Sequence, residues 1–371
     1  MRILILANSD SGLYQFRKEL LEKLCEKNEI ICSVPEKDGF IEKIEKIGGR
    51  CLKTVIDRRG KNPFKDKKLF DAYIKMIREV KPDVVLTYTV KPNIYGGLAC
   101  QRTKIPYISN ITGLGTAIEN GGFISQFLLF LYRFGLRKAK CVFFQNDNNK
   151  SYFERKKIVS NNIRLIPGSG VNTETHYLEE DPQDGETFKF LFVGRVMKDK
   201  GIEELLKATE RLHEYDSRVF LDIVGDCDED YSEQLRLSES KGFAKYHGKQ
   251  SDVHGFYANA HCVVLPSYHE GMANVLLEAA STGRPVIASK VPGCQETFDE
   301  GITGLGCEVR NADSLEEVMR KMLSMPFEIR KKMGLDGREK VKREFDRRLV
   351  VQAYMEEIEK VKKEKRVKVD L

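Results

Sequence analysis

Short apolar runs alternate with longer amphipathic stretches along almost the whole chain. The first run covers residues 3–7, a helix-like stretch covers residues 13–26, and the next apolar run covers residues 29–34. Such an alternation is typical of a parallel sheet, because neighbouring parallel strands need a crossover connection, usually a helix. Further apolar runs follow at residues 83–88, 106–109, 141–144 and 163–166. The sequence therefore predicts an α/β protein that begins with a Rossmann-like, doubly wound domain.

The alternation stops between Gly168 and Gly185, where glycine and proline stand among acidic and polar residues. It then resumes, with apolar runs at residues 188–193, 219–224, 262–265 and 285–288. A chain of 371 residues is about twice as long as a typical domain, which favours two domains. We therefore predict a first domain over residues 1–170, a linker over 171–186, a second Rossmann-like domain over 187–345 and a C-terminal helix over 346–371. One stripe of that helix is apolar, so we expect the helix to pack against one of the domains, and the first domain is one of the two candidates.

Charge and cysteine content narrow the class of protein. Sixty-two Lys and Arg against fifty-six Asp and Glu give a net charge of +6, too mild for a nucleic-acid binder that relies on phosphate neutralisation. Nine cysteines without a CxxC pair favour reduced thiols in a cytoplasm. The N-terminal apolar run is too short for a signal peptide, and no run approaches the roughly 20 apolar residues of a membrane span. We expect a cytoplasmic protein.

A basic loop bounded by glycines follows the first predicted strand of the second domain. It runs from Gly194 to Gly201, contains Arg195 and Lys200, and leads into a helix-like stretch over residues 202–212. Glycine allows a ligand to approach the backbone closely, and a helix N-terminus and cationic side chains favour anions. The loop is not a P-loop, because Asp199 occupies a position where that motif requires glycine. We interpret it as a diphosphate site; a surface turn with solvated lysines is the alternative.

Two carboxylates flank a second predicted helix start. Glu270 follows an apolar run that ends in Pro266, and Glu278 lies eight residues further on. Asn274 is the expected N-cap, which would place Glu278 about one turn into the helix. Phosphates would bind the helix N-terminus, and each carboxylate could accept hydrogen bonds from paired sugar hydroxyls. The alternative is a surface helix with ordinary charged residues.

Taken together, Gly194-Arg195-x4-Lys200-Gly201 followed by Glu270-x7-Glu278 resembles glycosyltransferase family 4. The similarity spans nearly the whole chain and includes Pro266-Ser267 before Glu270 and the stretches at residues 279–288 and 301–304. The resemblance implies the GT-B fold, in which two Rossmann-like domains face a cleft, and a retaining reaction. The residues around 87–97 and 110–115 resemble bacterial enzymes of capsule, O-antigen and exopolysaccharide assembly.

The resemblance also implies roles for individual residues. Arg195 and Lys200 would bind the diphosphate of a UDP-sugar donor, Glu278 its ribose, and Glu270 the hydroxyls of its sugar. Glu270, Arg195 and Lys200 are thus the candidate catalytic residues. The remaining candidate donor-binding residues are Gly12, Gly194, His247, Gly248, Gly271, Met272, Ala273, Asn274 and Val275.

The first domain departs from the family pattern at two places. The first loop, residues 8–14, offers only Gly12 where many members have a glycine pair. A histidine often precedes Gly-Leu-Gly in the family, whereas this chain has Thr112 before Gly113. A role of that histidine side chain cannot be transferred to Thr112, so Thr112 and Gly113 are candidates for main-chain or hydroxyl contacts on the acceptor or sugar side.

Asp226-Cys227-Asp228 has the spacing of the Asp-x-Asp metal motif of another glycosyltransferase fold. It lies inside the second nucleotide-binding domain, where a polar loop is the better interpretation. Arg195, Lys200 and a helix dipole can neutralise a diphosphate without a divalent ion. We therefore expect no metal and no other cofactor, the UDP-sugar being a substrate.

The stretch from Phe123 to Arg137 is apolar and aromatic, with basic residues at its end. It fits either a buried crossover helix, the commoner case, or a helix that lies on a membrane surface. The main functional hypothesis is transfer of a hexose or N-acetylhexosamine from a UDP-sugar to a saccharide acceptor. In one version of this hypothesis the acceptor is linked to polyprenyl diphosphate, and the protein acts at the inner face of the membrane. A UDP-sugar epimerase of the same fold and a non-catalytic sugar-nucleotide-binding protein are the alternatives.

Overall fold

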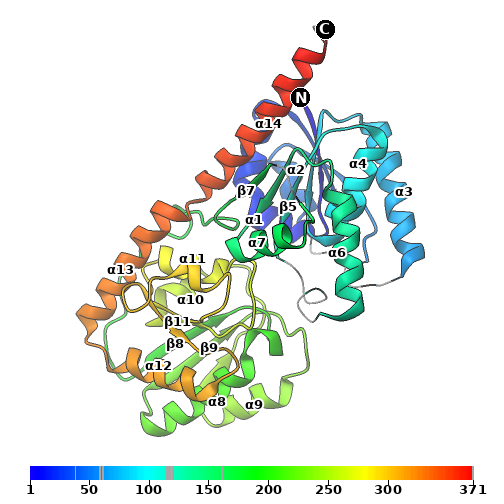
Figure 1. Cartoon of the computed structure of the whole chain (residues 1–371). Helices are drawn as coiled ribbons and strands as arrows, with labels where there is room; N and C mark the ends of the chain where they lie inside the picture. Colours follow the sequence, from blue (N-terminus) through cyan, green and yellow to red (C-terminus); the bar gives the residue numbers. More distant parts are fainter. Residues whose placement is uncertain are drawn as a thin grey trace. The chain divides into compact units, whose positions relative to one another are not determined.

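The computed structural model describes residues 1–37, 39–57, 60, 62–113, 118, 121–159 and 162–369. These residues form two compact units (Figure 1). The first unit contains Met1–Ser169 together with Arg347–Leu371, and the second contains Gly170–Asp346. The two terminal parts of the chain therefore share a unit.

The first unit is built on a parallel sheet of seven strands in the order β3-β2-β1-β4-β5-β6-β7. The strands are β1 (Arg2–Leu6), β2 (Glu29–Val34), β3 (Gly49–Lys53), β4 (Val84–Tyr88), β5 (Tyr107–Ile111), β6 (Cys141–Phe144) and β7 (Ile163–Leu165). The helices are α1 (Asp10–Cys25), α2 (Ile41–Lys46), α3 (Pro63–Val80), the π-helix η1 (Pro92–Gly96), α4 (Gly97–Thr103), α6 (Gly122–Leu136), α7 (Asp147–Arg155) and α14 (Arg347–Val369).

Strand β1 shows why both faces of this sheet are covered. Its side chains alternate between the faces, as in any strand, and all from Ile3 to Leu6 are buried. Ile3 and Ile5 pack in one cluster with α1 and α14, whereas Leu4 and Leu6 pack in another with α3 and α4. Figure 1 shows α14 on one side of the sheet and α3, α4 and α6 on the other.

The second unit has a six-stranded parallel sheet in the order β10-β9-β8-β11-β12-β13. The strands are β8 (Phe188–Val193), β9 (Val219–Val224), β10 (Ala244–Tyr246), β11 (Cys262–Leu265), β12 (Val286–Ser289) and β13 (Gly304–Cys307). The helices are the 3-10 helix η2 (Lys198–Lys200), α8 (Ile202–Tyr215), α9 (Ser232–Ser240), α10 (His254–Asn259), α11 (Asn274–Ser281), the 3-10 helix η3 (Gln295–Thr297), α12 (Ala312–Ser324) and α13 (Phe327–Glu344). The fold class, two doubly wound α/β domains, is as predicted.

Three edge-side strands have no counterpart among the predicted apolar runs. β3 has partly exposed residues, β10 has only three residues, and β13 alternates glycine with larger residues. Their residue types carry little strand propensity, and pairing with a neighbouring buried strand decides their conformation.

The segment 171–186, predicted as a linker, forms neither helix nor strand and belongs to the second unit. Its Asp181 and Asp184 pair there with Arg284 and Arg330.

Helix α6 is buried on one face only. Leu129, Tyr132 and Leu136 are buried in a cluster with α7, whereas Phe123 and Phe127 are exposed. The interpretation of this stretch as a core helix is therefore wrong for one of its faces. None of the helices in the described ranges is long and apolar enough to cross a membrane.

Candidate functional site

The candidate site of the second unit lies where the strand order reverses. β8 stands between β9 and β11, so that the connections after β8 and β11 leave the sheet in opposite directions. Open parallel sheets bind their ligands at such a point, outside the carboxyl ends of the strands. The loop that carries Arg195 and Lys200 follows β8, and the loop that carries Glu270 follows β11. The fold thus brings the two predicted motifs together.

Lys200 and Glu270 form the central contact between these loops. The Lys200 Nζ donates to the Glu270 carboxylate, and their side chains are only 18% and 15% exposed. The Ser267 hydroxyl donates to the same carboxylate oxygen at 2.8 Å. A cation and a carboxylate that are 70 residues apart in sequence are therefore adjacent and sheltered from water.

Glycine holds the two loops close. Gly201 has a φ of +72°, and a Cβ there would lie 2.1 Å from the Pro266 carbonyl oxygen. Gly293, after β12, has a φ of +86°, and its Cβ would lie 2.4 Å from the Glu270 carbonyl oxygen. Because only glycine tolerates both the backbone conformation and the approach, these residues fix Lys200 and Glu270 in place. The amide of Tyr268 adds a 2.9 Å hydrogen bond to the Asp199 carbonyl.

Arg195 stands in a more open environment. Its guanidinium pairs with Asp228 at 2.5 Å, and the arginine side chain is half-exposed. Asp228 belongs to the Asp226-Cys227-Asp228 stretch, which follows β9. Among the described residues, no group of three or more His, Cys, Asp or Glu side chains could hold a metal ion.

Glu278 lies one turn into α11, as expected, but Asn274 is not the N-cap of this helix. Asn274 is the first helical residue, and Ala273 occupies the cap position without a side-chain hydrogen bond. The Ala273 amide donates to the Gly293 carbonyl at 2.7 Å, and its carbonyl accepts from Leu276 and Leu277, so the neighbouring loop fixes the helix start. The expectation for Asn274 is therefore corrected.

The Glu278 carboxylate accepts a 2.8 Å hydrogen bond from the Tyr257 hydroxyl of α10. Burial, with Glu278 adding to the effect, raises the pKa of Tyr257 well above its ordinary value. The phenol therefore remains a donor, and its hydrogen bond orients the Glu278 carboxylate. Nothing in the sequence motif indicates this partner.

His247 and Gly248 follow β10, two strands away from β8. The His247 Nε2 lies 2.6 Å from Asp222 Oδ1, and the Gly248 carbonyl accepts from the Gly225 amide at 2.9 Å. Gly194 and Gly271 lie on the loops after β8 and β11, and Met272, Ala273 and Val275 lie at the start of α11. All of these candidates are thus at the carboxyl edge of one sheet or directly beyond it.

Gly12, Thr112 and Gly113 belong to the first unit. Gly12 lies in the first turn of α1 and donates its amide hydrogen to Ser9 Oγ at 3.0 Å. Thr112 and Gly113 directly follow β5 and are partly buried. Leu114 and Gly115, from the same predicted stretch, lie outside the described residues.

Two features at the carboxyl edge of the first unit were not found from the sequence. Thr89, next to the β1–β4 reversal point, has a φ of 72°, which is strained for a β-branched residue. The buried Asn93 accepts from Thr87 Oγ1 at 2.7 Å and donates to the Asn110 carbonyl at 2.8 Å, which joins the ends of β4 and β5. Strained backbone conformations cluster at functional sites. The strain at Thr89 could not be found from the sequence, because it is visible only in the backbone dihedral angles of the folded chain.

A cavity of about 520 Å³ lies at the other edge of the first unit. Pro82, Pro106 and Lys140 line it, and each precedes a strand. This is the amino edge of the parallel sheet, opposite to the edge where such sheets bind ligands. We therefore do not count this cavity as part of the candidate functional site.

Comparison with known proteins agrees with this arrangement. A family described as "Glycosyl transferases group 1" matches residues 175–340, and "Glycosyl transferase 4-like" matches residues 2–146. The chain is 26% identical to an N,N'-diacetylbacillosaminyl-diphospho-undecaprenol alpha-1,3-N-acetylgalactosaminyltransferase of Campylobacter jejuni, over 97% of this chain and 99% of that protein. It is also 26% identical to the capsular polysaccharide biosynthesis glycosyltransferase CapM of Staphylococcus aureus, over 77% and 79%.

Solved structures share the fold. The structure of HepE from Anabaena in complex with UDP and glucose matches with a TM-score of 0.80 at 17% identity, over 97% of this chain and 99% of that one. Sucrose-phosphate synthase from Thermosynechococcus elongatus matches with a TM-score of 0.83 at 21% identity, over 97% and 99%. At these identities the structural likeness establishes the architecture of both units and no more.

Proposed function

Because the chain belongs to the family 4 type of glycosyltransferases, with the GT-B fold, we propose that it transfers a hexose or N-acetylhexosamine from a UDP-sugar to a saccharide acceptor. The observation that carries the proposal is the Lys200–Glu270 pair at the strand reversal of the second unit. It supplies one cation for a diphosphate and one carboxylate for sugar hydroxyls, side by side.

The proposed donor contacts follow from the chemistry of each side chain. Lys200 and Arg195 neutralise the diphosphate, whose negative charge grows as the glycosidic bond breaks. Glu270 accepts hydrogen bonds from hydroxyls of the donor sugar, and Glu278, oriented by Tyr257, accepts them from the ribose. Two fixed cations and a helix N-terminus can balance the diphosphate, so we propose that transfer needs no metal ion.

We further propose that the reaction retains the anomeric configuration. The bond from the anomeric carbon to the diphosphate oxygen breaks, and the acceptor oxygen attacks on the same face. The departing phosphate takes the acceptor proton, while Lys200 and Arg195 hold the negative charge. Glu270 is already engaged by Lys200 and Ser267, which favours a binding role over that of a nucleophile.

For the acceptor we propose a saccharide on polyprenyl diphosphate, in the synthesis of a bacterial surface polysaccharide or glycan. The name of the Campylobacter relative states such an acceptor, and CapM acts in capsule synthesis. The corresponding location is the cytoplasm, at the inner face of the membrane. Nine free cysteines, most of them buried, agree with a reducing compartment.

A panel of UDP-, GDP- and ADP-sugars tests the proposal, with nucleotide release measured with and without lipid-linked saccharide. We expect release from one UDP-sugar that rises strongly when the acceptor is present. An isomerised donor without acceptor would identify an epimerase, and binding without either product would identify a non-catalytic protein. Release from another nucleotide alone would refute the UDP assignment.

Proton NMR of the first-formed product tests the stereochemistry. An α-linked donor should give an α-linked product, and a β-linked product would overturn the retaining mechanism.

Glu270→Gln should bind UDP nearly as well as the unaltered protein but transfer sugar more slowly. The amide fits the same space but lacks the charge that hydroxyl donors favour in the transition state.

A further inference from the structure

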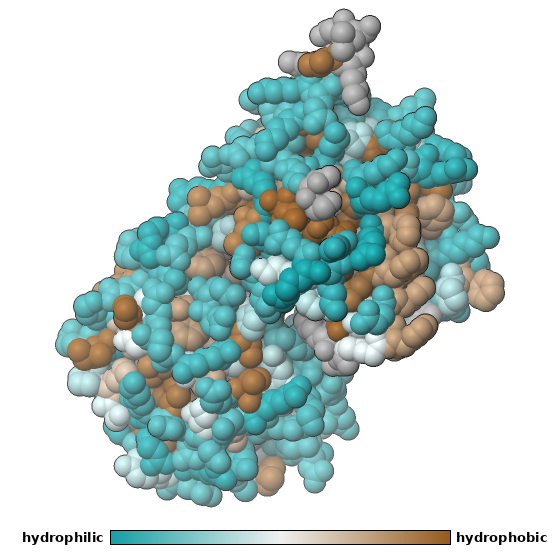
Figure 2. Space-filling view, viewed as in Figure 1, coloured by the Kyte–Doolittle hydropathy of each residue, from teal (hydrophilic) through white to brown (hydrophobic). Residues whose placement is uncertain are grey.

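Helix α6 exposes a narrow stripe of phenylalanines. Phe123, Phe127, Phe130 and Phe134 follow one another at steps of four, three and four residues, which places them on one face of the helix. They are 86%, 53%, 55% and 40% exposed. Figure 2 shows hydrophobic colouring where α6 lies in Figure 1. Since the opposite face of α6 already supplies the core, this stripe needs another partner.

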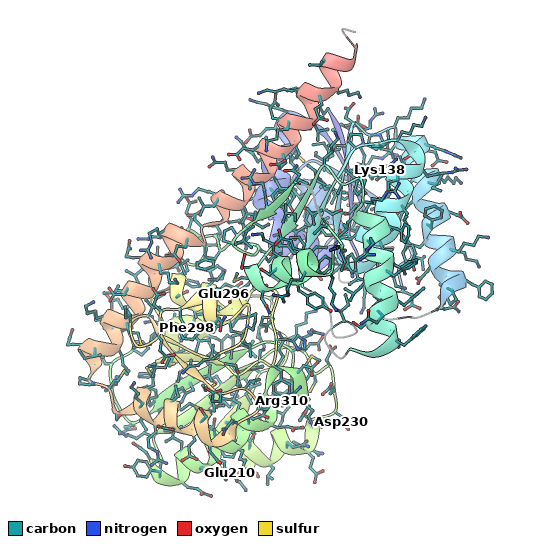
Figure 3. All side chains as sticks on the ribbon, viewed as in Figure 1. Lys138, Glu210, Asp230, Glu296, Phe298 and Arg310 are labelled. Atoms are coloured by element: carbon teal, nitrogen blue, oxygen red, sulfur yellow. The ribbon has the colours of Figure 1, made fainter. Side chains whose placement is uncertain are left out.

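Basic side chains surround the C-terminal end of the stripe. Arg133, Arg137 and Lys138 are exposed there, and Figure 3 labels Lys138 beyond the end of α6. Arg133 donates to the Lys156 carbonyl at 2.7 Å, which brings the exposed stretch 155–157 alongside. The group therefore consists of six cations, namely Arg133, Arg137, Lys138, Arg155, Lys156 and Lys157. Within the described part of the chain none of the six forms an ion pair, and α6 itself contains no acidic residue. The stretch 155–157 contains no acid either, and the exposed Glu154 directly precedes it.

We propose that this face of α6, the phenylalanine stripe with its six cations, docks on an anionic lipid membrane. The phenyl rings would enter the boundary between headgroups and acyl chains, and the cations would bind anionic headgroups. A second copy of the chain fits less well, because a two-fold contact would bring the same patch, and its like charges, together.

The direction of α6 gives this docking a use. The helix connects β5 to the parallel strand β6, so it runs from the carboxyl edge of the sheet to the amino edge. Phe123 therefore lies at the end nearer the carboxyl edge. This consequence rests on the proposed function: a lipid-linked acceptor would reach the ligand edge of the first unit directly from the membrane.

Vesicle flotation of the full chain tests the docking. We expect binding to vesicles of phosphatidylglycerol and phosphatidylcholine in equal parts, and much weaker binding to phosphatidylcholine alone. Phe127→Ser with Phe130→Ser should lower the affinity at least about tenfold. Arg137→Glu with Lys138→Glu should lower it on the order of 25-fold or more, since each cation contributes about fivefold. The matched control is Ile329→Ser, which removes a 51% exposed side chain from α13 of the second unit and should leave binding unchanged.

Thermal unfolding and sedimentation velocity complete the test. All substituted side chains are on the surface, so the unfolding temperature should stay near that of the unaltered chain. Wild-type-like flotation of both double variants would overturn the proposal. Loss of a dimer in the phenylalanine variant, without vesicle binding by the unaltered chain, would assign the stripe to a second copy instead. Vesicle binding needs neither donor nor acceptor, so it can fail or succeed independently of the proposed reaction.

Discussion

Substitution of Lys200 by alanine tests the central contact of the site. The change leaves the Glu270 carboxylate, 15% exposed, with the Ser267 hydroxyl as its remaining side-chain donor at 2.8 Å. Breaking a fully buried ion pair costs about 3–5 kcal/mol of unfolding free energy, and an exposed pair about 0–1 kcal/mol. This pair lies between the two cases, and we expect a loss of about 2 kcal/mol. For a unit of this size that lowers the unfolding temperature by roughly 4–8 °C.

The same change should slow sugar transfer by more than it destabilises the fold. A charge-assisted contact to the diphosphate is worth about 1.5–3 kcal/mol, so turnover should fall about 10- to 150-fold. Arg195→Ala is the matched comparison, because its partner Asp228 is at the surface and its own side chain is half-exposed. It should lose transfer to a similar degree with little change in unfolding temperature.

The double variant Lys200→Ala with Glu270→Gln separates the two effects. Removing both charges leaves no unpaired carboxylate, so most of the lost stability should return. Transfer should remain low, because the diphosphate still lacks its cation. Thermal unfolding and UDP release from the donor give the two readouts. Unchanged transfer in Lys200→Ala, or transfer restored in the double variant, would refute this account of the site.

Four further outcomes are expected. Tyr257→Phe removes the 2.8 Å hydrogen bond to Glu278 and should weaken UDP binding about three- to tenfold in calorimetry. Gly201→Ala places a Cβ 2.1 Å from a backbone oxygen and should lower the unfolding free energy by about 1–3 kcal/mol and slow transfer; an unaltered melting curve would contradict this. Burial lowers the pKa of His261 below its usual 6.5, so the unfolded chain binds more protons there, and stability should fall as the pH drops below that value. His261→Asn should flatten that part of a plot of unfolding temperature against pH. EDTA should leave transfer intact, and a loss restored by Mg²⁺ would show a metal requirement.

The residue pattern was sufficient to predict the strands that lie inside the sheets. β1, β4, β8 and β11 are buried on both faces, so they appear as continuous apolar runs in any context. The charged motif residues could also be predicted, because they stand directly after such runs, where parallel sheets bind ligands. Arg195, Lys200, Glu270 and Glu278 all lie there or on the helix that follows.

Other features depend on contacts between residues that are distant in sequence. The edge-side strands β3, β10 and β13 take their conformation from a neighbour, and the start of α11 is fixed by Gly293 and not by Asn274. The exposed face of α6 is decided by which of its sides packs on α7. The sequence alone determined where the buried strands and charged groups stand along the chain, because those depend on local burial and residue type. Only the tertiary structure decided that Lys200 meets Glu270 and Tyr257 meets Glu278. The first pair joins the segments that follow β8 and β11, and the second joins α10 to α11, so both depend on how the strands and helices of the second unit pack.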